Sequence, residues 1–407
     1  MTTSGESGWT SLWPAGTATG VGSLPGTDPL AAAKLVFDEF PDLPHLVELP
    51  GRGPGGDMLG RAAVIAAELP VDLQPSGWRL VPRPGLDYRR ARSMVEQDLD
   101  ALEEAADGYA GPLKIAVAGP WTLAASVELT RGHKALSDYG AARDLAESLA
   151  VGLDELLTSI ARRVPGARLL VQLDEPSLPA ALAGRIRTPS GFSVLRVVSE
   201  ELAGERLGLV LAKAAAVKHV VGVGVHCCAP DVPLALLRRA GAQFVGLDAT
   251  LLTQDADDAI GEAVEAGLRL MTGVVPSTDR VDTTPPPSPS AALAADAKAG
   301  TAPRRPAVAA RGRSSERIAW ATGREEAPAA QDGGPAVGGG WSDLSDPGRT
   351  VDPVRSLWRR LGFRPEQLGE VVAVTPTCGL AGASERYARL AMRHCRAAAR
   401  VLVESPE

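Results

Sequence analysis

The chain has few cysteines. Four occur in 407 residues, and two of them, Cys227 and Cys228, are adjacent. Four cysteines do not make a disulfide framework for a chain of this length, which argues against a disulfide-stapled secreted fold. In a reducing compartment, clustered cysteine and histidine instead favour metal binding or catalysis.

An excess of basic charge and long apolar runs are also missing. The formal net charge is -7, which argues against nucleic acid or an anionic membrane surface as the main partner. No apolar run reaches membrane-spanning length, and the first residues lack the basic and apolar regions of a signal peptide. We therefore expect a cytoplasmic protein with no nucleic-acid and no membrane partner.

The composition is that of a globular protein, with 45% hydrophobic and 22% charged residues. A chain of 407 residues can bury a large core, as one large α/β barrel or as two ordinary domains. Short runs rich in Val, Ile and Leu alternate with longer amphipathic segments. This alternation is typical of βα units around a parallel sheet.

Eight strands are expected, over residues 17–23, 45–49, 114–118, 169–173, 220–226, 244–247, 268–275 and 371–375. Helices are expected over residues 28–40, 59–69, 88–109, 139–163, 193–216, 232–240, 255–266 and 384–403. Eight strands, most followed by a helix, predict a single closed (β/α)₈ TIM barrel. An open doubly wound sheet is the alternative. Polar residues at the C-terminal end of nearly every strand favour the barrel, because such barrels build their sites there.

One segment interrupts the pattern between the seventh and eighth strands. Residues 279–346 contain proline-rich and glycine-rich runs and little periodic apolar pattern. Such a segment cannot bury enough surface to offset its ordering entropy, so we expect a disordered low-complexity insert. The expected organisation is a flexible N-terminus over 1–16, barrel strands one to seven over 17–278, and strand eight with the last helix over 347–407.

Residues of metal-ligating types stand at several strand ends. His226 and Cys228 end the fifth strand and point the same way, because side chains on a strand alternate, while Cys227 points the other way. Asp248 ends the sixth strand and Cys378 follows the eighth. In a barrel these ends share one rim, so the four side chains would converge on a site that suits zinc. The alternative is that the cysteines are small buried hydrophobes.

Carboxylates end two other strands. Asp174 and Glu175 end the fourth, where one can face the barrel mouth for catalytic acid/base work or ammonium recognition while the other pairs with a neighbour. Helix capping is the alternative. Glu48 ends the second strand in a similar way, and the backbone N–H groups of Gly22 and Ser23 would lie close to a ligand carboxylate.

Together these motifs resemble the C-terminal catalytic barrel of cobalamin-independent methionine synthase and its shorter single-barrel relatives. The resemblance covers about residues 17–275 and 371–403. Its parts are Gly22-Ser23-Leu24-Pro25, Glu48 with Asp57-Met58, Gly119-Pro120-Trp121-Thr122, Gln172-Leu-Asp-Glu-Pro176, His226-Cys-Cys228, Gly246-Leu-Asp248 and Pro376-Thr-Cys-Gly379. The resemblance depends on their order and on their placement at strand ends. The broader superfamily, with uroporphyrinogen decarboxylase and corrinoid-dependent methyltransferases, shares the barrel.

The resemblance implies a zinc-dependent S-methyltransferase that methylates homocysteine to methionine. A free thiol is mostly protonated near neutral pH, whereas a metal-bound thiol is held as a thiolate, so zinc would make the nucleophile. The residues that the resemblance assigns are His226, Cys228, Asp248 and Cys378 to zinc, Glu48 and Asp174 to the substrate ammonium group, and Ser23 to its carboxylate.

The sequence departs from that family's pattern in three ways. Asp248 stands where the family usually has a glutamate. The seventh strand, through Thr278, lacks the aspartate and histidine that the full-length enzymes carry nearby. The second, N-terminal barrel of those enzymes has no counterpart here. The methyl donor is therefore open between a methyl-folate, a methyl-corrinoid protein and another donor. The alternatives to homocysteine methylation are another thiol acceptor and a non-catalytic barrel that binds a small molecule.

Overall fold

The structure is a computed structural model that describes residues 11–279 and 344–407. The expected flexible N-terminus therefore lies outside the described residues over 1–10, and the expected insert does so over 280–343. The described residues that border the insert are anchored. Asp279 accepts hydrogen bonds from the backbone N–H of Ser384 at 3.0 Å and from its hydroxyl at 2.6 Å.

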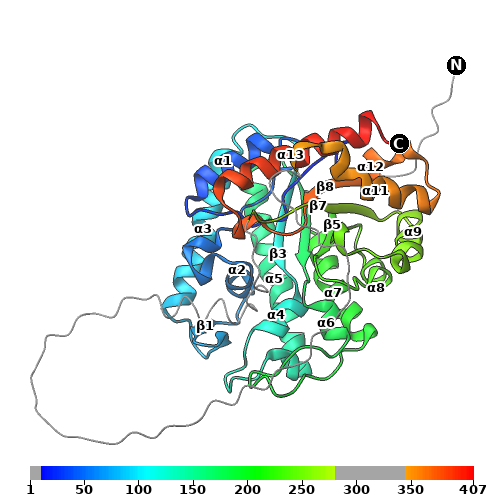
Figure 1. The fold of residues 1–407 in the computed structure, drawn as a ribbon. Helices are drawn as coiled ribbons and strands as arrows, with labels where there is room; N and C mark the ends of the chain where they lie inside the picture. The colour runs from blue at the N-terminus through cyan, green and yellow to red at the C-terminus, as the bar shows by residue number, and fades with distance from the viewer. Residues whose placement is uncertain (1–10, 280–343) are drawn as a thin grey trace, which may run out of the picture.

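A curled parallel sheet of six strands forms the centre of the molecule (Figure 1). The strands are β3 (Pro112–Ala118), β4 (Arg168–Asp174), β5 (Val220–Cys227), β6 (Phe244–Asp248), β7 (Arg269–Val275) and β8 (Val372–Pro376). Their order in the sheet is their order in the chain. They correspond to the last six strands that the sequence predicts, and the predicted parallel α/β class is confirmed.

Helices surround this sheet on its outer side (Figure 1). They are α1 (Pro29–Glu39), α2 (Met58–Ile65), α3 (Leu86–Ala105), α4 (Pro120–Ser126), α5 (Tyr139–Arg163), α6 (Leu178–Leu182), α7 (Glu200–Ala215), α8 (Leu234–Arg239), α9 (Asp257–Glu265), α11 (Pro347–Leu361), α12 (Leu368–Val371) and α13 (Glu385–Glu404). Asp28 caps α1 by accepting from the N–H groups of Leu30 and Ala31, with Pro29 in the first turn. In the part of the chain that the structure describes, none of these helices is long and apolar enough to span a membrane.

The first two expected strands do not form as continuous strands. Isolated parallel bridges tie Ala18 to Val374, Ser23 to Glu48 and His45 to Lys114. These bridges place residues 17–24 beside β8 and residues 45–48 beside β3.

A close contact between the two segments accounts for the interruption. A Cβ at residue 20 would clash with the ring of His45, so only glycine fits there. Glycine weakens a strand interior because it adds no packing and costs more backbone entropy.

The inner face of the sheet has an apolar layer in the N-terminal halves of its strands. Its members are Leu12, Trp13, Leu43, Leu170, Phe244, Met271 and Ala373. The ring of Trp13 meets Phe244 edge-on, with centroids 5.9 Å apart. Leu12 and Trp13 fall within the range expected to be a flexible N-terminus, yet they are 5% and 2% exposed and pack against β4, β6 and β7. Apolar side chains from outside the sheet fill the space between the strands there. At Gly222 of β5, for example, an added Cβ would lie 2.9 Å from Leu12.

The sequence prediction lacks the short helices α4, α6 and α12, and also a hairpin and the helix α11. An antiparallel hairpin, β1 (Val71–Gln74) and β2 (Gly77–Leu80), lies between α2 and α3. Helix α11 begins after the N-cap Asp346 and continues through Pro353. Its prolines and the adjacent low-complexity run obscure the helical pattern, because proline usually marks a helix boundary.

Candidate metal centre

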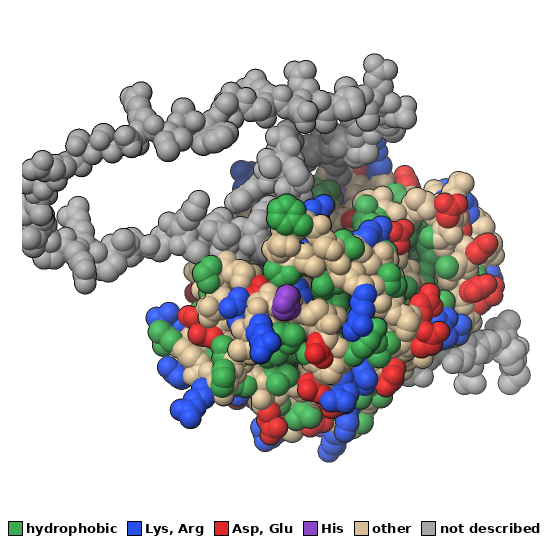
Figure 2. Space-filling model, turned by 90° about the horizontal axis from the view of Figure 1, so that it is seen from below, with side chains coloured by type: hydrophobic (Ala, Val, Ile, Leu, Met, Phe, Trp, Pro, Cys, Tyr) green, Lys and Arg blue, Asp and Glu red, His purple; other side chains and the backbone are tan. Residues whose placement is uncertain are grey.

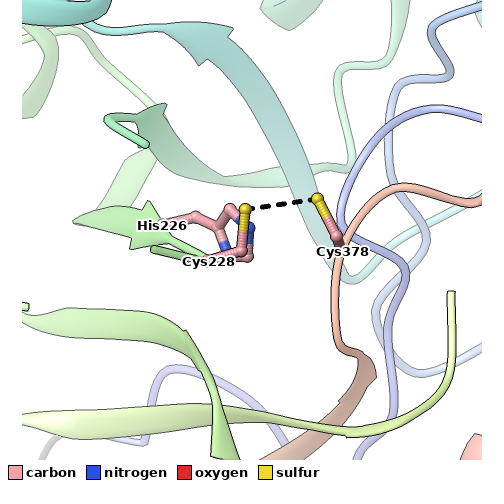
Figure 3. A group of neighbouring side chains, drawn as sticks. All are labelled: His226, Cys228 and Cys378. Carbon is pink, nitrogen blue, oxygen red and sulfur yellow. Dashed lines mark hydrogen bonds between the residues drawn. The ribbon is translucent and has the colours of Figure 1, made fainter. Parts of the chain in front are cut away.

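His226, Cys228 and Cys378 come together at one edge of the sheet. His226 lies near the end of β5, Cys228 directly follows that strand, and Cys378 follows β8 (Figure 3). One potential ligand atom from each lies within 4.8 Å of the others. The two sulfur atoms are 3.3 Å apart and point toward each other. Strand alternation buries Cys227 on the opposite side of β5.

The neighbouring strand makes room for the imidazole. A Cβ at Gly246 of β6 would lie 2.8 Å from His226 Nδ1, so a larger residue would displace the ring. His226 is buried, and its Nε2 has no hydrogen-bond partner among the described residues. A buried polar atom without a partner is unfavourable. A metal ion would provide the missing partner.

The two thiols are electrostatically coupled. The hydrogen bond with Cys228 lowers the pKa of Cys378, and the same contact raises the pKa of Cys228. The pair therefore gives up its first proton readily and its second reluctantly. An imidazole with two closely spaced sulfurs is a donor set that fits zinc, and a cation between them would favour the doubly deprotonated state.

Asp248, the fourth expected ligand, does not join this cluster. Its Oδ1 accepts from the N–H of Thr250 at 2.9 Å and from the hydroxyl of Thr250 at 2.6 Å, capping a short 3₁₀ turn at Ala249–Leu251. The short aspartate side chain hydrogen-bonds its own local backbone, as Asp commonly does at turns. The cluster in the described residues thus has three protein donors.

Glu48 and Asp174 line the inner side of the sheet next to this cluster. Asp174 pairs in register with His226 and accepts from Gln172 at 2.7 Å. Glu48 pairs with Ser23, and an added Cβ on Gly22 would lie 3.8 Å from its Oε2. Both carboxylates are about 95% buried. Burial raises the pKa of Glu48 to about 8 and that of Asp174 to about 6.

Ser23 lies against the loop that carries Cys378. Its backbone oxygen accepts from the N–H of Leu380 at 2.8 Å. Its hydroxyl occupies the space that a Cβ on Gly379 would need, so residue 379 must be glycine for the two segments to approach. The structure therefore brings Ser23, Glu48 and Asp174 to the same edge of the sheet as the cluster.

Glu175 faces the other side of β4. It is fully buried and accepts from the N–H groups of Trp121 and Thr122 and from the Thr122 hydroxyl, at 2.9, 2.7 and 2.8 Å. Burial raises its pKa to about 7, and these hydrogen bonds oppose the rise. The geometry is that of a helix cap on α4, and it gives no support to a catalytic role for Glu175.

Sequence reasoning missed several buried polar side chains that surround these carboxylates. Lys114 of β3 is fully buried and donates to Gln172 Oε1 at 2.7 Å, and burial lowers its pKa to about 7. Arg61 of α2 lies 3.8 Å from Glu48 and forms an ion pair with Asp98 of α3. One signal was available: Lys114 is a charged residue within the otherwise apolar strand β3.

The end of the molecule that carries α4 and α6 has charges of both signs. These helices directly follow β3 and β4 and lie at the lower end in Figure 1. Figure 2 views the molecule from this end. Acidic and basic side chains are interspersed there with apolar ones on the uncovered part of this face.

The chain was compared with known proteins. No protein-family model matches the sequence, and no curated protein matches it. A solved B12-independent methionine synthase from Shewanella sp. W3-18-1, in complex with selenomethionine, superposes with a TM-score of 0.52 at 11% identity. The match covers 96% of this chain and 98% of that one. A structure from Burkholderia cenocepacia J2315, described as a candidate lyase/mutase, matches with a TM-score of 0.28 at 12% identity, over 69% of this chain and 74% of that one. At these identities the first match shows that the chain shares an α/β fold related to that of a methionine synthase.

Proposed function

We propose that this protein is a cytoplasmic zinc-dependent S-methyltransferase that converts homocysteine to methionine. The observation that carries the proposal is the convergence of His226, Cys228 and Cys378 beside the buried carboxylates Glu48 and Asp174. The fold shared with a B12-independent methionine synthase supports it. A site for an amino acid with a thiol needs a metal to hold the sulfur as a thiolate and carboxylates to bind the ammonium group.

The proposal includes a complete (β/α)₈ barrel. Residues 17–24 are bridged to β8 and to residue 48, and residue 45 is bridged to β3. The order β8, 17–24, 45–48, β3 is the order in which strands one and two of such a barrel would join its ends. In this proposal the two segments would take the places of the first and second strands, held by fewer hydrogen bonds than a full ladder.

In this mechanism His226, Cys228 and Cys378 would hold the zinc ion. Zinc, when bound, lowers the pKa of a thiol ligand so that the substrate sulfur is held as a nucleophilic thiolate. In this proposal Glu48 and Asp174 would pair with the ammonium group, and the hydroxyl and N–H of Ser23 would contact the carboxylate. The sulfur then forms a bond to the methyl carbon as the bond between that carbon and the donor breaks.

A methyl-corrinoid protein is a second candidate donor, beside a methyl-folate. Residues 270–278, which include the end of β7, contain no acidic or basic side chain. A folate amine must gain a proton when it loses its methyl group, whereas a corrinoid cobalt leaves with its electron pair and needs none. A corrinoid donor is therefore the candidate that needs no acid or base from residues 270–278.

The test is methionine formation by the purified protein. Zinc content is measured first, and the zinc-loaded protein is then incubated with homocysteine and either methyl-folate or a methyl-corrinoid protein, with methionine quantified by mass spectrometry. Cys378→Ser serves as the inactive control. A wild-type protein without stoichiometric zinc contradicts the proposal. Zinc binding without methionine from either donor would instead favour another thiol acceptor or a non-catalytic barrel.

A further inference from the structure

Two polar side chains, those of Lys114 and Gln172, are buried inside the sheet next to the proposed substrate site. Lys114 of β3 donates to Gln172 Oε1 of β4 at 2.7 Å, and both residues are at most 1% exposed. Gln172 Nε2 donates to Asp174 Oδ1 at 2.7 Å. Both side chains also donate to the backbone oxygen of Val21, at 2.8 Å from Lys114 and 3.1 Å from Gln172.

These contacts replace part of a missing strand ladder. The bridges of residues 17–24 leave Val21 between the backbone hydrogen bond from Thr19 to Val374 and the one from Glu48 to Gly22. A buried carbonyl needs a donor, and the two side chains provide it. They therefore fix the position of the segment that continues into Ser23.

We propose that Lys114 and Gln172 are a positioning pair that sets the Ser23 segment against Asp174 and makes the site selective for thiols with an α-amino-acid group. The inference rests on the proposed function and extends it to two residues that touch no substrate.

The hydrogen-bond directions enforce this arrangement. An ammonium group only donates, so the amide of Gln172 must present its oxygen to Lys114 and its NH₂ to Asp174 and Val21. Lys114 thereby selects the orientation of Gln172, and Gln172 selects the orientation of the Asp174 carboxylate. One pair of side chains thus fixes the groups proposed to bind the ammonium and the carboxylate of the same substrate.

Hydrogen bonding supports the same selectivity. Lys114 lies beside both carboxylates, and Arg61 lies 3.8 Å from Glu48. A substrate ammonium group adds hydrogen bonds to Glu48 and Asp174 that a ligand without this group cannot make. A buried polar group without a partner is unfavourable, so a ligand that lacks the ammonium group binds more weakly.

The test compares methionine with two truncated analogues, 4-(methylthio)butyrate without the amino group and 3-(methylthio)propylamine without the carboxylate. Calorimetry on the purified full-length protein gives the affinity ratio of methionine to each analogue. In Lys114→Met we expect both ratios to fall about tenfold or more, because hydrogen bonds to charged groups lose their alignment. Zinc content should stay at the wild-type level, since neither Lys114 nor Gln172 touches the metal cluster.

Replacing a buried lysine can prevent folding, so Gln172→Met provides a second variant with the same expected fall in the ratios. Lys134→Met is the matched control. The side chain of Lys134 is 13% exposed, donates to Ser126 O at 2.9 Å and lies 3.7 Å from Glu128, and its loss should leave both ratios unchanged.

Unchanged ratios in a folded Lys114→Met or Gln172→Met protein would overturn the positioning pair and leave the proposed function intact. A lowered melting temperature with wild-type affinity ratios would show that the pair contributes to stability alone. This outcome too would overturn the positioning pair and leave the proposed function intact. Absence of methionine binding in the wild type would overturn both proposals.

Discussion

Asp174 and Glu175 are neighbours on the chain, but their carboxylates lie on opposite sides of β4. Asp174 points inward and accepts from Gln172 at 2.7 Å, whereas Glu175 points outward and accepts from Trp121 and Thr122. Strand alternation produces this division. The inner carboxylate lies beside the metal cluster, and the outer one joins β4 to α4.

Replacing Glu175 by alanine should lower stability and leave ligand binding intact. The change leaves the N–H groups of Trp121 and Thr122 without an acceptor in a buried place. We expect the free energy of unfolding to fall by about 1–3 kcal/mol in urea titrations. Asp174→Ala is the control, because we expect this variant to bind methionine weakly. Loss of methionine binding in Glu175→Ala at wild-type stability would place Glu175 in the site.

Asp248→Asn should retain zinc, whereas Cys228→Ser and Cys378→Ser should lose it. The Asp248 carboxylate is engaged with Thr250 and lies outside the cluster, while the two sulfurs are 3.3 Å apart. Zinc stoichiometry and chelator competition measure the difference. Cys227→Ala is the control, because that thiol faces away from the cluster. A loss of zinc affinity in Asp248→Asn comparable to that in Cys378→Ser would show that Asp248 ligates the metal after all.

The positions of β3 to β8 were accessible from the sequence because they depend on local patterns. The approach of Cys378 to His226 and Cys228 followed from the expectation that strand ends share one rim. Apolar β-branched runs predict β3 to β8, and strand alternation separates Cys228 from Cys227. The position of Asp248 was not accessible in this way. Whether its carboxylate reaches across the rim or caps Thr250 depends on the local turn, which a strand-end pattern does not specify.

The buried polar residues were not predicted for a different reason. Lys114 and Arg61 are stabilised by partners far away in sequence, such as Val21 and Asp98. The local hydrophobic periodicity of a sequence does not predict such pairs. The first two strands were predicted from their apolar residues. Close packing of Gly20 on His45 interrupts their pairing, and that contact too depends on the tertiary structure.

Trp13→Ala should destabilise the protein strongly. Trp13 is 2% exposed and packs against Phe244 in the apolar layer inside the sheet. Removing a buried tryptophan costs about 3–5 kcal/mol through lost burial and the cavity left behind. Phe192→Ala is the control, because Phe192 is 97% exposed and its removal should change stability by less than about 0.5 kcal/mol. Equal unfolding midpoints for the two variants would contradict the packing role of Trp13.

Methionine binding should strengthen as pH rises from 6 to 8. Burial raises the pKa of Glu48 to about 8, so below pH 8 this carboxyl is mainly protonated and cannot pair with an ammonium group. Binding then releases a proton, and the affinity falls by up to about tenfold for each pH unit below 8.

Glu48→Gln isolates the contribution of this carboxyl. The variant should bind methionine more weakly than the wild type at pH 8.5, where Glu48 is ionised. It should approach wild-type affinity at pH 6, where Glu48 is neutral in the wild type as well. Calorimetry in two buffers with different ionisation enthalpies measures the affinity and the proton release together. A wild-type affinity that is constant over this range, or a variant with the same pH slope and proton release as the wild type, would show that Glu48 does not pair with the ammonium group.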